Sequence, residues 1–218
     1  TEGLSLRLPI VPPPMRNHGN VILSLSELCR WLGKQVEEQG GVDLFTGFSG
    51  RELLMEGDRV VGVRTGDKGI GKHGGRKGNF EPGIDLKAKV TLLGEGPRGT
   101  LTKALRPRLR LDEGRNPPAY GTGVKEVWEL ARDGFEGKVV HTMGFPLDAH
   151  TMGGSFLYGM AARRAVIGFV TWLNTSDPFC DPHADLQRLK THPYVRALLE
   201  GGKLLQYGAK AVPEGGYF

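Results

Sequence analysis

The sequence predicts an α+β protein in two parts, and three observations lead to this prediction. Residues 24–39 repeat apolar side chains at helical spacing. Several segments of the second half alternate apolar and polar residues, which is typical of antiparallel strands with one covered face. A basic, proline-containing stretch over residues 106–118 separates the halves. We therefore expect one domain over residues 1–110, and a mostly antiparallel sheet with flanking helices over residues 111–218.

Composition excludes several classes of protein. The 218 residues include 29 lysines and arginines against 24 acidic residues, and this net charge of +5 permits an anionic partner without requiring one. No apolar run approaches the ~18 residues of a membrane-spanning helix. Residues 1–10 do not have the pattern of a signal peptide. The two cysteines, Cys29 and Cys180, are too few for a disulfide framework or an iron–sulfur cluster.

The first part is predicted to contain one helix and several short strands. Residues 4–15 form an apolar loop, because three consecutive prolines exclude a helix interior or a central strand. Ser24 or Ser26 caps the helix over residues 24–39, and two glycines end it. We expect strands at 42–45, 51–55, 59–64 and 84–93, with a hairpin joining the middle two and a glycine-rich loop or wide hairpin over 66–83.

The second part is predicted to be mostly strands. A short helix over residues 100–105 precedes it, and a helical stretch over 183–201 is interrupted at Pro193. The expected strands lie at 120–128, 138–145, 155–159, 165–173 and 203–212.

Three glycine-rich segments are candidate sites. Gly94-Glu95-Gly96 follows an apolar segment and precedes a helix, a geometry that brings backbone N–H groups to a phosphate, although a plain tight turn has the same pattern. The segment 141–156 has two histidines and an aspartate without metal-ligand spacing, and its glycine pair suits either a flat ligand or a sheet-edge turn. The loop 66–83 is basic but has one aromatic residue, Phe80, which favours a solvated loop over a nucleic-acid site.

Several longer motifs follow one another in a distinctive order. Asn17-His18-Gly19-Asn20 precedes the first helix, and Gly66-Asp67-Lys68-Gly69-Ile70 precedes the Gly94 turn. The second part contributes residues 120–128, 141–148, 151–158, 192–193, 199–203 and 207–209. In this order, over essentially the whole chain, the sequence resembles the middle of the electron transfer flavoprotein–ubiquinone oxidoreductases.

The resemblance implies a monotopic membrane flavoenzyme with FAD, one [4Fe–4S] cluster and a ubiquinone site. Such an enzyme takes electrons from reduced electron transfer flavoprotein and passes them to ubiquinone. The family's first phosphate-binding turn and its cluster cysteines have no counterpart in this sequence. We therefore expect an internal fragment that is inactive alone and holds neither cofactor stably. The implied location is the cytoplasmic face of a bacterial inner membrane, or the matrix side of the mitochondrial inner membrane.

The resemblance also carries site residues over to this sequence. For FAD it implies Gly94, Glu95, Gly96, Val42 and Phe45; for ubiquinone, Gly153, Gly154, Met152 and Phe156; and for the membrane surface, Leu4, Leu6, Leu8 and Ile10. It implies no catalytic acid or base and no metal ligand in this segment. The implied partners are electron transfer flavoprotein, ubiquinone and the membrane surface, but not nucleic acid.

Two departures from the family pattern leave alternatives open. Met152 stands where the family usually has tyrosine, so an apolar contact is kept and a hydroxyl is lost. Ser24 stands where the family often has arginine. The alternatives are a related flavin-dependent reductase that supplies nitrogen fixation or reduces isoprenoid lipids, a non-catalytic isoprenoid- or quinone-binding module and, with least support, a basic RNA-binding domain.

Overall fold

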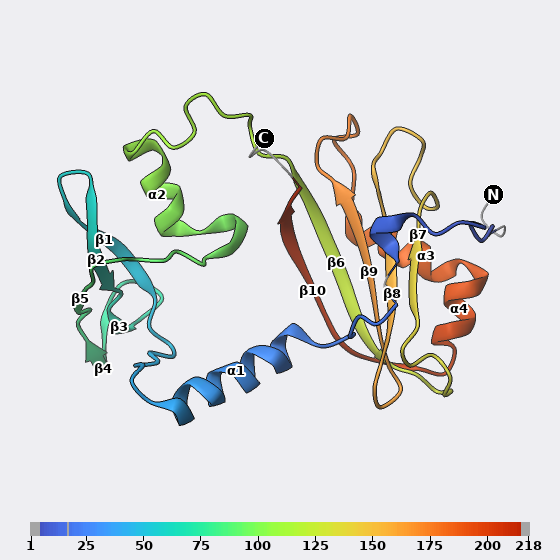
Figure 1. The fold of residues 1–218 in the computed structure, drawn as a ribbon, viewed down its shortest axis with the longest axis horizontal. Helices are drawn as coiled ribbons and strands as arrows, with labels where there is room; N and C mark the ends of the chain where they lie inside the picture. The colour runs from blue at the N-terminus through green and yellow to red at the C-terminus, as the bar shows by residue number, and fades with distance from the viewer. Residues whose placement is uncertain (1–4, 17, 215–218) are drawn as a thin grey trace. The chain divides into compact units, whose positions relative to one another are not determined.

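The computed structural model describes residues 5–16 and 18–214 (Figure 1). The chain divides into two compact units, of which one comprises the residues up to Arg30 and from Pro118 onward, and the other comprises Trp31–Pro117. Each unit contains antiparallel strands and at least one helix, so the predicted α+β class is confirmed. A short 3₁₀ turn, η1 (Pro13–Met15), lies in the apolar loop near the start.

The predicted first helix forms as α1 (Leu25–Gln39). The Ser24 hydroxyl accepts the Glu27 N–H at 3.4 Å, and the Ser24 carbonyl accepts the Leu28 N–H at 3.0 Å. The serine therefore begins the helix as the sequence predicted.

The unit Trp31–Pro117 contains two small antiparallel sheets. The predicted hairpin forms from β1 (Gly50–Glu56) and β2 (Arg59–Thr65), and β5 (Asp85–Lys87) adds to β2. The glycine-rich segment forms a second hairpin from β3 (Lys68–Ile70) and β4 (Arg76–Glu81), which confirms the wide hairpin. A 3₁₀ turn, η2 (Gly96–Arg98), leads into α2 (Thr100–Arg108), which is longer than predicted.

Two strand predictions in this unit are wrong. Residues 42–45 form no strand, and only β5 forms within 84–93. Their apolar side chains are exposed, with Val42 at 61%, Val90 at 73% and Leu92 at 91%. A strand needs a neighbour to accept its backbone hydrogen bonds, and within the described residues 42–45 and 89–93 have no neighbouring strand.

The other unit is built on one five-stranded antiparallel sheet with the order β10-β6-β9-β8-β7. All five strands were predicted, several of them from alternating residues. Two helices, α3 (Pro182–Thr191) and α4 (Pro193–Leu199), meet at Pro193, where the sequence predicted the interruption. The strands are β6 (Tyr120–Glu129), β7 (Val139–Thr142), β8 (Gly153–Met160), β9 (Arg164–Trp172) and β10 (Lys203–Pro213).

The two faces of this sheet differ in burial. On β8, Ser155, Leu157 and Gly159 are buried, whereas Gly154, Phe156 and Tyr158 between them are half-exposed. Since side chains alternate along a strand, one face is the core face and the other is the half-exposed face. The core face packs with α3 and α4 through Val124, Leu157, Ile167, Phe169, Leu186, Leu189, Val195 and Leu199.

A buried ion pair joins the core face to α3. The Lys190 ammonium donates to both carboxylate oxygens of Glu126, at 2.8 and 3.0 Å, and Trp128 and Gln187 donate to the same carboxylate. Burial raises the pKa of Glu126, but the hydrogen bonds from these three side chains lower it more, so the pKa lies below its ordinary value. The carboxylate is therefore charged and satisfied in the folded protein.

Replacing Lys190→Met should destabilise the protein by about 3–5 kcal/mol, because the Glu126 charge stays buried without its cation. Since the pKa of Glu126 is lowered on folding, its contribution is present above the ordinary glutamate pKa and lost as pH falls through the lowered value. Urea unfolding at several pH values measures both effects. Arg132→Gln breaks the exposed Arg132–Glu200 pair and should cost less than about 1 kcal/mol. Equal losses in the two variants would contradict the buried pair's role.

Candidate functional site

The glycine pair predicted to meet a quinone lies at the start of β8. Gly153 is opposite Thr171 and Gly154 is opposite Val170 on β9. A Cβ on Gly153 would lie 2.3 Å from the Val170 carbonyl oxygen, and a Cβ on Gly154 would lie 2.4 Å from the Thr142 carbonyl oxygen. Both distances are far below van der Waals contact, so the packing of neighbouring strands itself requires glycine at both positions.

The other two residues predicted at the quinone site flank this pair. Met152 is 59% exposed, and its carbonyl accepts the Trp172 N–H at 3.0 Å, which holds its backbone against β9. The Phe156 ring lies over Gly168, where a Cβ would come within 2.1 Å of the ring. Gly154 and Phe156 thus share the half-exposed face, whereas Gly153 belongs to the core face by alternation.

An aromatic row extends this half-exposed face beyond the predicted residues. The Phe156 and Tyr158 rings lie 4.9 Å apart, and His141 on β7 meets Tyr158 edge-on at 5.7 Å. The His141 Nε2 and the Tyr158 hydroxyl are 3.1 Å apart and share a hydrogen bond. The sequence alone does not predict this pairing, which requires the register of β7 on β8 in addition to alternation.

The loop before the glycine pair is fixed by its own polar groups. The Asp148 carboxylate accepts the N–H groups of His150 and Thr151 at 2.9 and 2.8 Å. Hydrogen bonds from Thr151 and from the His150 amide lower the pKa of Asp148. The aspartate therefore acts as a turn residue. Within the described residues, no group of three His, Cys, Asp or Glu side chains is arranged to hold a metal ion.

The glycine turn predicted to contact FAD is organised around Glu95. Its carboxylate accepts the N–H groups of Leu101 and Thr102 at 3.1 and 2.8 Å, and the Thr102 hydroxyl at 2.9 Å. Those hydrogen bonds, from Thr102 first and then Leu101, lower the pKa of Glu95. A Cβ on Gly99 would lie 2.6 Å from the Glu95 Cβ, so Gly99 leaves room for this cap. The first amides of α2 are therefore occupied by the protein's own carboxylate.

The turn itself leaves open space beside its two glycines. No heavy atom lies within 4 Å of a Cβ built on Gly94 or on Gly96, and Gly96 has a φ of +72° that favours glycine. Val42 is 61% exposed, and Phe45 is 47% exposed and packs edge-on against Phe48 at 5.7 Å. Within the described residues, no hydrogen bond or ring contact joins Val42 or Phe45 to the turn. Gly94, Glu95 and Gly96 thus lie together in one turn, whereas no such contact links the described Val42 and Phe45 to it.

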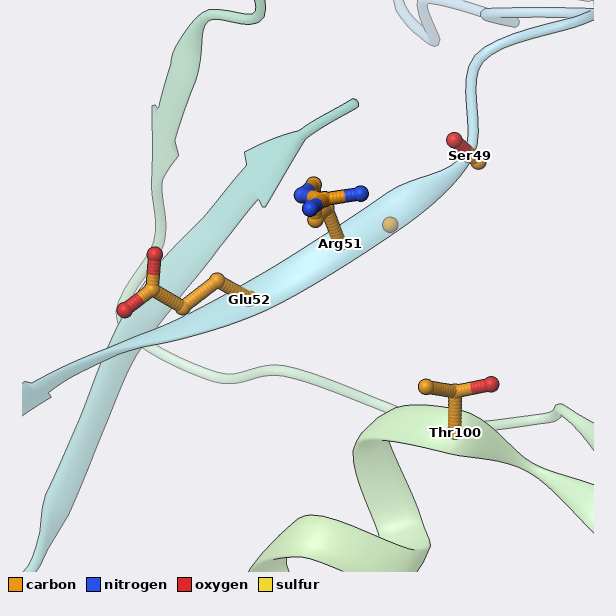
Figure 2. A pocket seen from close by; sticks show the side chains of 5 residues that line it. Ser49, Arg51, Glu52 and Thr100 are labelled. Atoms are coloured by element: carbon orange, nitrogen blue, oxygen red, sulfur yellow. The ribbon is translucent and has the colours of Figure 1, made fainter. Parts of the chain in front are cut away.

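A shallow pocket lies beside the start of α2 (Figure 2). It measures about 440 Å³ and is lined by Ser49, Gly50, Arg51, Glu52 and Thr100. A second depression of about 530 Å³ in the other unit is lined by Glu129, Asp133, Ala162, Arg163, Arg164 and Leu205. Neither contains a residue predicted to bind FAD or ubiquinone.

The segment predicted to meet a membrane surface is exposed where the structure describes it. Leu6, Leu8 and Ile10 are exposed by 84%, 66% and 73%, while Leu4 lies outside the described residues. No described helix combines the length and apolar character needed to cross a bilayer.

Comparison with solved structures finds the same fold in two enzymes at low sequence identity. The flavin-dependent brominase Bmp2 matches with a TM-score of 0.53 at 11% identity, over 87% of this chain and 43% of the brominase. The myxobacterial chondrochloren halogenase CndH, an FAD-dependent halogenase, matches with a TM-score of 0.52 at 16% identity, over 86% and 40% of the two chains. The fold class is therefore one that FAD-dependent enzymes use.

Sequence comparison narrows this class to one family. Residues 120–212 match the family "ETF-QO, ubiquinone-binding". The mitochondrial electron transfer flavoprotein–ubiquinone oxidoreductase of Arabidopsis thaliana is 46% identical over 95% of this chain, and those of Dictyostelium discoideum and Homo sapiens are 42% identical over all of it. The chain is homologous over its length to a segment of the electron transfer flavoprotein–ubiquinone oxidoreductases, as the motifs predicted. It spans 33–36% of the length of these relatives.

Gly154→Ala should destabilise the protein by about 1–3 kcal/mol, because the added methyl group meets the Thr142 carbonyl oxygen. The control is Gly208→Ala on β10, where no heavy atom lies within 4 Å and the change should stay within about 0.5 kcal/mol. Urea unfolding without any ligand compares the two variants. Equal stability would mean that strand packing does not explain the glycine at 154.

Glu95→Ala should speed amide hydrogen exchange at Leu101 and Thr102 relative to the amides of β2. The cap is a carboxylate with a lowered pKa, so wild-type protection is full above the ordinary glutamate pKa and is lost as pH falls through the lowered value. Exchange measured by NMR between neutral and acid pH tests both statements. Unchanged exchange at both amides would contradict the cap.

Proposed function

We propose that a longer protein containing this segment passes electrons from reduced electron transfer flavoprotein to ubiquinone. Residues 1–110 would contribute part of its FAD-binding domain, and residues 111–218 most of its ubiquinone-binding domain. The observation that carries the proposal is the family match over residues 120–212, which includes all four residues predicted to meet the quinone.

The quinone site is proposed on and beside the half-exposed face of the sheet. Gly154 presents bare backbone there, and Phe156 offers a ring beside it, so an apolar planar ring can lie flat against the strand. Met152 is exposed next to the pair and supplies an adaptable apolar contact. Gly153 sets the strand spacing behind this surface.

The proposed flavin contacts divide into two kinds. The open space beside Gly94 and Gly96 fits close approach of a cofactor to the backbone. The N-terminus of α2 does not fit a phosphate, because Glu95 already occupies its amides. FAD would exchange electrons with both partners. In this arrangement Glu95 fixes the turn, and exposed Val42 and Phe45 are available to the adenine side.

The remaining roles are proposed for the longer protein. The exposed apolar residues Leu6, Leu8 and Ile10, with Leu4, would contact the membrane surface on the matrix side of mitochondria or the cytoplasmic side of bacteria. A [4Fe–4S] cluster would be held by other segments. We propose that the isolated chain is inactive and holds no FAD stably, which fits segments 42–45 and 89–93, for which the described residues provide no neighbouring strand.

Met152→Ala in the full-length protein should raise the KM for ubiquinone roughly tenfold, since burying a methionine side chain is worth about 1.5–3 kcal/mol. Reduction of the flavin by reduced electron transfer flavoprotein should stay unchanged. Stopped-flow flavin reduction and steady-state ubiquinol formation measure the two half-reactions separately.

Met160→Ala, at the far end of β8, is the matched control and should leave both half-reactions unchanged. An unchanged KM in Met152→Ala would contradict the assigned quinone site. A wild-type protein that binds ubiquinone but is not reduced by electron transfer flavoprotein would favour a non-catalytic quinone-binding module instead.

A further inference from the structure

The β3–β4 hairpin carries a local excess of positive charge. Residues 68–80 contain four of the chain's lysines and arginines and no acidic residue. Lys72, Arg76 and Lys77 are exposed, and Lys68 is half-buried. Asp67 and Glu81 flank the segment, but the Asp67 carboxylate accepts the Gly83 N–H at 2.8 Å. The charge therefore projects from a defined structure into solvent.

The hairpin is held in shape by its backbone and by ring contacts. Gly71 N–H donates to the Gly75 carbonyl at 2.7 Å, and a Cβ on Gly69 would lie 2.4 Å from the Asn79 carbonyl oxygen. The Lys68 ammonium lies 3.3 Å from the centre of the Phe48 ring, and the Arg76 guanidinium 4.1 Å from that of Phe80. Such contacts orient a cation while leaving its charge uncompensated.

Another basic stretch of the same unit differs in this respect. Over residues 103–115, Arg106 pairs with Asp112 at 2.8 Å, Arg110 pairs with Glu113 at 3.6 Å, and Arg108 donates to the Gly57 carbonyl at 2.9 Å. Within the described part of the chain, none of the four hairpin cations forms an ion pair with a carboxylate. The ion pairs of residues 103–115 therefore stabilise the local fold, whereas the hairpin cations, which lack such pairs among the described residues, are available to a partner.

We infer that the β3–β4 hairpin is a docking surface for the electron-donating flavoprotein, which would meet it with acidic side chains, and this inference rests on the proposed function. Membrane-surface binding combines basic residues with large exposed apolar side chains. On the hairpin, Ile70 is exposed by only 40% and Phe80 is half-buried beneath Arg76. An uncompensated, preoriented charge with little apolar surface suits the steering of an oppositely charged protein.

The triple variant Lys72→Gln, Arg76→Gln and Lys77→Gln in the full-length protein tests the inference. Stopped-flow reduction by reduced electron transfer flavoprotein should slow roughly tenfold at low ionic strength, and its dependence on salt should flatten, because steering by charge is screened. Ubiquinol formation by chemically prereduced enzyme should stay unchanged. Lys34→Gln, Arg110→Gln and Lys138→Gln together remove equal charge from other exposed positions and should leave the salt dependence intact.

The outcomes separate this inference from the proposed function. A wild-type salt slope in the hairpin variant, with normal reduction by the flavoprotein, overturns the docking surface and leaves the proposed function standing. Failure of the wild-type enzyme to accept electrons from the flavoprotein overturns both. The last test measures binding of the hairpin variant to vesicles of phosphatidylcholine and cardiolipin. If the variant loses vesicle binding while its reduction by the flavoprotein is unchanged, the hairpin is a membrane contact and the inference is overturned.

Discussion

The close approach of neighbouring backbones around β8 is the constraint on which the unit with the five-stranded sheet depends. A Cβ on Gly159 would lie 1.7 Å from the Phe135 carbonyl oxygen, and similar clashes arise at Gly153 and Gly154. These glycines lower the intrinsic strand propensity of β8. The central position of β8 between β7 and β9 compensates for that, because both of its edges are hydrogen-bonded. Strand spacing, and with it the position of every side chain on the half-exposed face, follows from this packing.

The two faces of the sheet then take on different tasks. The core face buries its apolar residues and the Glu126–Lys190 pair against the helices, which fixes α3 in register. The half-exposed face has its Phe156 ring over Gly168 and its bare backbone at Gly154, so it is flat where a side chain would otherwise stand. A rigid covered face keeps the opposite face in shape, as the proposed contact with a planar quinone ring requires.

The sequence predicted those elements whose partners lie within the chain. The alternation in β6, β8 and β9, the serine cap of α1 and the break at Pro193 are local signals that agree with the tertiary structure. Residues 42–45 and 89–93 also contain apolar runs, but the part of the chain that the structure describes offers them no neighbouring strand, so local pattern could not decide their structure. Composition also could not show whether the glycine pair of β8 is required by a ligand or by the spacing of neighbouring strands. The cap formed by Glu95 was hidden for the same reason, because it depends on a turn that brings residues six positions apart together.

The chain meets its two proposed partners by different physical means. Ubiquinone is apolar, and in the proposed site a glycine-lined strand beside Phe156 and Met152 would recognise it by shape and contact area, which salt hardly changes. The proposed protein donor would be recognised at longer range by charge that the hairpin leaves unpaired. A donor must leave after each transfer, and charge-steered association is fast without requiring a large apolar interface. Glycines contribute to both surfaces. Those of β8 let strand backbones approach closely, and those between β3 and β4 shape the turn that presents the cations.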